Sequence, residues 1–199
     1  MSKASRLILA VVSLAFLVAY LQPLWRVTLE APQYPEGLGM LIWVNTITGE
    51  KPHDLANING LNHYIGMQEI VPDSIPELRY MPVILGLMAA LGLVTAVLGK
   101  RRLLFLWFGL MVVLALAGLA DFWKWTYEYG HNLDPTAAIK VPGMAYQPPV
   151  IGSKMLLNFK ANSWPALGGW ILIAGTALVG LATLVEVRDS RKQGTGESV

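Results

Sequence analysis

The sequence contains no cysteine. A disulfide framework, an iron–sulfur cluster and a thiolate metal site are therefore excluded within this chain, and any metal ion must be held by histidine, methionine, carboxylate or backbone groups. Signatures of other chemistries are missing too, because the chain has no G-x-S-x-G elbow, no P-loop and no G-x-G-x-x-G motif. The sequence thus gives no support to nucleophilic hydrolysis or nucleotide binding, and we expect that the protein is not an enzyme.

Charged residues are scarce. They make up 14% of the 199 residues, whereas 54% are hydrophobic; a soluble domain has roughly 25% charged residues. Three uncharged apolar runs, residues 81–99, 103–120 and 166–185, are each close to the roughly 20 residues needed to cross a bilayer. Residues 7–24 form a fourth run, which lacks the A-x-A-like cleavage site of a signal peptide. The predicted fold class is membrane α-helical, a bundle of four transmembrane helices.

No ionisable residue lies at the centre of these four runs. Ion paths, proton relays and many transport sites depend on such residues, so we do not expect a pump, channel or transporter acting alone. Nucleic acid is not an expected partner either, because there is no basic patch with interleaved aromatic residues. Small residues at four-residue spacing favour close packing within one bundle. These pairs are Gly86/Ala90, Gly92/Ala96 and Thr176/Gly180.

The runs divide the chain into six segments. They are residues 1–24 (N-terminus and first span), 25–80 (polar loop), 81–121 (helical hairpin with a basic turn), 122–165 (second polar loop), 166–185 (last span) and 186–199 (a charged tail, expected to be disordered). Eight of the fifteen Lys and Arg residues lie on the N-terminus, the turn and the tail. The positive-inside rule therefore places both termini in the cytoplasm and both loops outside the inner membrane of a bacterial cell.

We expect the two loops to form a small mixed α/β cap. In the first loop, residues 40–46 have the pattern of a strand, and residues 61–70 that of a short helix. In the second loop, four aromatic residues are typical of a belt at the outer membrane interface. They are Trp123, Trp125, Tyr127 and Tyr129.

The stretch HDLANINGLNHYIGM, residues 53–67, holds the strongest candidates for a metal site. If the residues after Gly60 are helical, His63 and Met67 are four apart and lie on one face. Thioether ligands select Cu(I), so this pair predicts a copper site. The alternative is that His63 forms a hydrogen bond within a loop and Met67 fills an apolar gap.

Three further residues complete the predicted copper site. His131 and Met144 would join from the second loop, and His53 would be a peripheral entry ligand. Each also has a simpler explanation: His53 as a solvated surface residue, His131 as a cap at a helix C-terminus, and Met144 as part of a rigid Pro-Gly-Met turn.

The segments LEAPQYPEGLGMLIWVN (29–45) and NHYIGM (62–67), together with VPGMAYQPP (141–149), resemble small membrane proteins found in gene clusters for nitrous oxide reductase, a periplasmic copper enzyme. The resemblance implies an accessory role in copper delivery or maturation. The copper chaperone of such clusters is a lipoprotein with cysteine ligands, so this chain is not that component. No ligand set is implied.

The sequence therefore predicts an inner-membrane accessory protein that binds copper or hands it to a periplasmic or membrane copper enzyme, or to its maturation factors. A second hypothesis is a non-catalytic structural or assembly subunit of a larger respiratory or copper-enzyme complex, since loops rich in Pro, Trp and Tyr suit docking surfaces. A third is an electron-transfer subunit with histidine and methionine as axial haem ligands.

Overall fold

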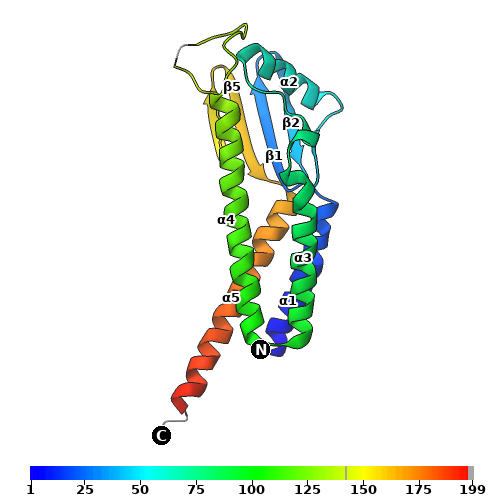
Figure 1. The fold of residues 1–199 in the computed structure, drawn as a ribbon, viewed down its shortest axis with the longest axis vertical. Helices are drawn as coiled ribbons and strands as arrows, with labels where there is room; N and C mark the ends of the chain where they lie inside the picture. Colours follow the sequence, from blue (N-terminus) through cyan, green and yellow to red (C-terminus); the bar gives the residue numbers. More distant parts are fainter. Residues whose placement is uncertain (142, 197–199) are drawn as a thin grey trace.

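The computed structural model describes residues 1–141 and 143–196. Pro142 and residues 197–199 lie outside the described residues. The elements are α1 (Lys3–Ala15), the 3-10 helix η1 (Phe16–Tyr20), β1 (Trp25–Ala31), β2 (Tyr34–Ile42), β3 (Ile47–Gly49), α2 (Asp54–Ile65), the 3-10 helix η2 (Pro72–Ser74), α3 (Glu77–Leu98), α4 (Arg101–His131), β4 (Gly152–Leu156), β5 (Phe159–Pro165) and α5 (Leu167–Gly196). Helices α1, α3, α4 and α5 form a bundle, and the strands and α2 form a cap at one end of it (Figure 1).

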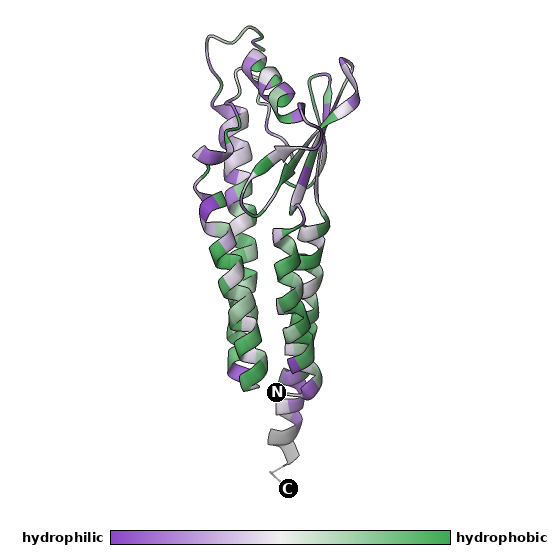
Figure 2. Cartoon of the chain, turned by 90° about the vertical axis from the view of Figure 1, so that its right-hand side faces the viewer, coloured by the Kyte–Doolittle hydropathy of each residue, from purple (hydrophilic) through white to green (hydrophobic). Residues whose placement is uncertain are grey.

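Within the described residues, four helices are long and apolar enough to cross a membrane. They cover Lys3–Tyr20, Glu77–Leu98, Arg101–His131 and Leu167–Ser190. Many of their apolar side chains point away from the bundle; Leu87, for example, is 65% exposed and Val97 is 74% exposed. Figure 2 shows hydrophobic residues along the bundle and more hydrophilic ones in the cap and at the opposite end. This surface suits a bilayer, as the four apolar runs predicted.

The bundle interior is held by aromatic and small residues. Phe16 and Trp107 are fully buried, with ring centroids 5.9 Å apart, and Trp107 Nε1 donates a hydrogen bond to Met88 O at 2.8 Å. A Cβ on Gly92 would lie 2.0 Å from Ser13 Oγ, so α3 and α1 approach closely there. The prediction that Gly92 serves packing within the bundle is confirmed.

The cap is built on a five-stranded antiparallel sheet with the order β3-β2-β1-β5-β4. Its central strand β1 pairs with β2 on one side and β5 on the other, so that Val27 lies between Met40 and Ser163. Residues of the two predicted loops, far apart in the sequence, therefore share one sheet. The expectation that the two loops form one mixed α/β cap is confirmed, and the sheet in it has five strands, more than the one strand predicted.

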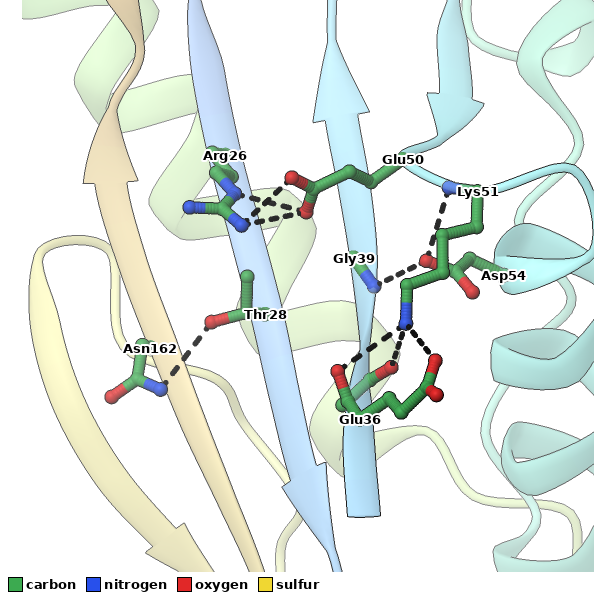
Figure 3. A network of polar contacts seen from close by, with 9 residues as sticks. Arg26, Thr28, Glu36, Gly39, Glu50, Lys51, Asp54 and Asn162 are labelled. Atoms are coloured by element: carbon green, nitrogen blue, oxygen red, sulfur yellow. Dashed lines mark hydrogen bonds and ion pairs between the residues drawn. The ribbon is translucent and has the colours of Figure 1, made fainter. Parts of the chain in front are cut away.

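The two faces of the sheet differ in polarity. On β1, Val27 and Leu29 point to the cap core, whereas Arg26, Thr28 and Glu30 lie on the other face. The inner face is covered by α2 and the last turns of α4. The outer face carries a polar network, in which Arg26 Nη2 pairs with Glu50 at 2.8 Å and Asn162 Nδ2 donates to Thr28 Oγ1 at 3.3 Å (Figure 3). A polar outer face is expected where a sheet borders water.

Helix α4 corrects the predicted boundary of the second loop. It continues past residue 120 to His131. A helix of 31 residues is about 46 Å long, whereas the hydrocarbon core is only about 30 Å thick, so its last turns extend into the cap. The predicted aromatic belt is consequently split. Trp125 and Tyr129 pack together in the cap with centroids 4.3 Å apart, while Trp123 and Tyr127 stack on the exposed side at 5.3 Å.

Three other boundaries also differ. The predicted helix at 61–70 is α2, which begins at Asp54 and ends at Ile65. The predicted strand at 40–46 is β2, which begins at Tyr34 and ends at Ile42 before the turn into β3. The expected disordered tail is helical as far as Gly196. The tail is anchored because Glu186 is buried and accepts hydrogen bonds from Ser5 Oγ and Arg101 Nε.

Candidate functional site

Helix α2 is fixed at its start by a buried carboxylate. Asp54 is 3% exposed and accepts hydrogen bonds from the backbone N–H groups of Gly39 at 2.8 Å and Lys51 at 3.2 Å (Figure 3). A carboxylate in the first turn also interacts favourably with the helix dipole. Asp54 therefore ties α2 to strand β2 of the sheet.

The position at which α2 ends determines whether His63 and Met67 lie on one helical face, as predicted. Gly66 adopts the left-handed conformation with φ 81°, and the N–H of Met67 bonds to Asn62 O at 2.9 Å. This is the hydrogen-bond pattern of a glycine-terminated helix. The chain has thus left the helix before Met67, and the prediction that the two side chains lie on one helical face is wrong.

The two side chains lie in different surroundings. His63 is exposed, and its ring contacts Tyr64 with centroids 6.2 Å apart. Met67 is half-buried and packs against the cap core, which is the gap-filling role typical of methionine. Copper binding by either residue stays a prediction. The two side chains are not, however, stacked one helical turn apart, which was the arrangement that suggested a shared copper site.

The second loop meets the end of α2 at a contact that we call the loop seam, formed by Tyr64, Gly66, Asp134 and Ile139. Asp134 N donates to Gly66 O at 2.8 Å, and Ile139 N donates to Tyr64 O at 2.9 Å. A Cβ on Gly66 would lie 2.9 Å from Asp134 O. Glycine is therefore needed at this position both for its conformation and for the close approach of the second loop.

The carboxylate of Asp134 faces a positive and hydrogen-bonding environment. Its Oδ1 accepts hydrogen bonds from Thr136 Oγ1 at 2.6 Å and Thr136 N at 2.7 Å. These bonds, followed by the positive charges of His63 and Lys140, hold the pKa of Asp134 below its ordinary value. The ionised carboxylate of Asp134 thus lies within electrostatic range of the exposed His63 imidazole, without forming an ion pair with it.

Sequence reasoning missed Asp134. The available signal was the run HNLDPT, in which Asp134 is followed by Pro135 and Thr136. An aspartate in such a run typically accepts hydrogen bonds from the residue two positions on.

The other three predicted ligands have surroundings of their own. His131 ends α4, donates Nδ1–H to Tyr127 O at 2.9 Å and stacks on the Tyr127 ring at 3.9 Å, so it caps the helix as the alternative explanation proposed. Met144 is half-buried; the preceding Pro142 of its predicted turn lies outside the described residues. His53 is exposed at the opposite end of α2, about 15 Å from His63 along the helix axis.

Across residues 1–141 and 143–196, no three His, Asp or Glu side chains are grouped so that they could hold a metal ion. The three histidines therefore do not form a common site, although the loops that carry them converge.

A second feature is a cavity of about 70 Å³ between the inner face of the sheet, α2 and the end of α4, which we call the cap cavity. Two polar atoms in its walls, Trp125 Nε1 and Tyr146 Oη, are buried and make no hydrogen bond to any described residue. The cavity is lined by Val27, Leu29, Met40, Ile58, Leu61, Asn62, Ile65, Met67, Ile70, Trp125, Thr126, Tyr129, Tyr146, Pro148, Leu156 and Phe159.

No protein-family model matches this chain, and no curated protein matches it. The functional argument therefore depends on the four apolar helices, the cap and its loop seam.

Proposed function

We propose that this chain is an accessory protein of the bacterial inner membrane whose cap lies in the periplasm and hands copper to a periplasmic or membrane copper enzyme. The observation that carries the proposal is the exposed His63 imidazole at the loop seam, within electrostatic range of the ionised Asp134 carboxylate. The resemblance of residues 62–67 to proteins from nitrous oxide reductase clusters points in the same direction.

The distribution of charge supports the orientation. The start of α1, the end of α5 and the turn between α3 and α4 lie at the end of the bundle opposite the cap (Figure 1). Three consecutive basic residues lie there: Lys100 in the turn, and Arg101 and Arg102 at the start of α4. Basic residues concentrate on the cytoplasmic side of membrane proteins, so the cap would face the opposite side.

The chemistry of the seam suits transfer better than storage. A neutral imidazole nitrogen is a good copper ligand, and a carboxylate adds negative charge. An exposed imidazole on an open surface leaves coordination positions free for the ligands of a receiving protein.

A copper titration tests this proposal. The purified protein would compete with a chromophoric Cu(I) chelator under anaerobic conditions, and we expect His63→Ala to weaken the affinity at least tenfold. His53→Ala is the matched control, because it removes an exposed histidine from the other end of the same helix. Equal affinities of the wild type and His63→Ala would remove the copper assignment.

A second candidate function is that of an assembly subunit that docks on a larger enzyme complex without carrying metal. It is favoured by a hollow of about 350 Å³ on the outer side of the cap, where Trp164 and Trp170 are each about half exposed beside Arg26. Tryptophan and arginine are enriched at protein interfaces. This function predicts a metal-free complex in native membranes that Trp164→Ala weakens and Trp123→Ala, on the exposed side of α4, does not.

A further inference from the structure

We propose that the cap cavity binds a small, uncharged, mostly apolar molecule that carries a hydrogen-bond-accepting oxygen. The inference does not depend on copper binding at the loop seam, because the cavity lies under the sheet and its walls include neither His63 nor Asp134; Met67 contributes to them only as an apolar side chain.

The walls exclude a charged ligand. Among the described residues that line the cavity, none is charged. Most are aliphatic or aromatic side chains from the inner face of the sheet and from α2, such as Val27, Ile58 and Ile65. An ion in these surroundings would lose its hydration without gaining a counter-charge, which is strongly unfavourable.

The two unbonded polar atoms define what the ligand must offer. Tyr146 is 2% exposed, and its hydroxyl has no hydrogen-bond partner in the described part of the chain. The same holds for Trp125 Nε1. An indole N–H can only donate, so a ligand that satisfies it must accept. Folded proteins rarely leave such buried groups unbonded, because each one costs about 1–3 kcal/mol.

The surroundings of the two donors make the site preformed. Tyr146 N donates to Gly130 O at 2.9 Å, and a Cβ on Gly130 would lie 2.4 Å from Gln147 N, so this segment is packed directly on the end of α4. The Trp125 indole N–H approaches the Tyr129 hydroxyl without the geometry of a full hydrogen bond, and that hydroxyl donates to Glu69 O at 3.3 Å. The backbone that carries Tyr146 is therefore held in place against the end of α4.

The volume limits the size of the ligand. A cavity of about 70 Å³ exceeds the roughly 30 Å³ that one water molecule occupies and is smaller than the roughly 150 Å³ of a cavity that binds benzene. A small ketone or amide fits this interval. Its carbonyl oxygen would accept from Tyr146 and Trp125 while its methyl groups contact the apolar walls.

The test follows the indole N–H signal of Trp125 by NMR in ¹⁵N-labelled protein, with acetone as the probe. The chain has seven tryptophans, and Trp125→Phe identifies the signal. We expect acetone to shift it saturably, and Tyr146→Phe to weaken acetone binding roughly fivefold, the factor of one net hydrogen bond. Tyr127→Phe, on the exposed side of α4, serves as the control and should leave the binding unchanged.

Isobutene provides a test that needs no variant, because it has the shape of acetone without the accepting oxygen. Weaker binding of isobutene than of acetone to the wild-type protein supports the proposal. A Trp125 signal that acetone does not shift would mean that water alone occupies the cavity and would overturn it. Equal binding of isobutene and acetone would overturn it as well.

Discussion

At the scale of single residues, Asp134 connects the electrostatics of the loop seam to its structure. Its carboxylate is held by two hydrogen bonds from Thr136 and lies near the imidazole of His63. Both influences stabilise the ionised form, and the pKa of Asp134 is lowered accordingly. A lowered pKa in the folded state means that the ionised carboxylate stabilises the fold at pH values above its ordinary pKa. This contribution is lost as the pH falls through the lowered pKa.

Removing the hydroxyl donor tests this assignment. We predict that Thr136→Val raises the pKa of Asp134 toward its ordinary value, because the largest stabilising interaction of the carboxylate is lost. The carboxyl ¹³C shift of Asp134, followed through a pH titration, measures the change. Thr28→Val on the outer face of the sheet is the control and should leave that titration unaltered. If the Thr136 variant titrates like the wild type, the hydrogen bonds do not set the pKa.

At the scale of elements, α2 contains two glycines with different roles. Gly66 ends the helix with φ 81° and contacts the second loop, whereas Gly60 lies within the helix with no atom within 4 Å of where its Cβ would be. Gly66 is required both for its backbone conformation and because a side chain would not fit. Neither reason applies to Gly60.

These roles predict opposite effects of the same substitution. Gly66→Ala should destabilise the cap by about 1–3 kcal/mol through its strained conformation and its clash with Asp134 O. Gly60→Ala should stabilise it by about 0.5–1 kcal/mol, because alanine favours a helix. Unfolding in detergent gives the free energies, and hydrogen exchange of the Asp134 and Ile139 amides reports on the seam. Faster exchange in Gly60→Ala than in Gly66→Ala would contradict this account.

The elements also show what the sequence could and could not predict. The four apolar helices follow from long runs without charge. Strand β5 was missed because its inward positions are not uniformly apolar: Ser163 is buried there, accepts from Trp25 Nε1 and donates to Val150 O. The predicted metal pair failed for a local reason, since the left-handed turn at Gly66 places Met67 outside the helix. The approach of Asp134 to the end of α2 depends on contacts between distant segments, and no local pattern could reveal it.

At the scale of the whole molecule, a buried carboxylate joins the bundle at the end opposite the cap. Glu186 on α5 is 1% exposed and accepts hydrogen bonds from Ser5 Oγ at 2.9 Å, Arg101 Nε at 3.0 Å and Ser2 N. It therefore connects α5 with the starts of α1 and α4, whose packed residues otherwise meet through apolar contacts.

Loss of this carboxylate should weaken the whole bundle. We predict that Glu186→Ala lowers the free energy of unfolding by about 3–5 kcal/mol, because Arg101 and the two serines lose a buried partner. Glu36→Ala, which removes an exposed carboxylate from the cap, should change it by no more than about 0.5 kcal/mol. Thermal or denaturant unfolding in micelles compares them. Equal stability of the two variants would show that the buried carboxylate does not hold the helices together.

The central claim is that the bundle spans a membrane with its cap outside the cytoplasm, and the absence of cysteine allows a direct measurement of it. Single variants Lys154→Cys, in the exposed edge strand of the cap, and Lys100→Cys, in the turn between α3 and α4, would be treated in spheroplasts with a membrane-impermeant maleimide. We predict labelling of Lys154→Cys in intact spheroplasts and of Lys100→Cys only after the membrane is permeabilised. The reverse pattern, or labelling of both variants in intact spheroplasts, would contradict the claim.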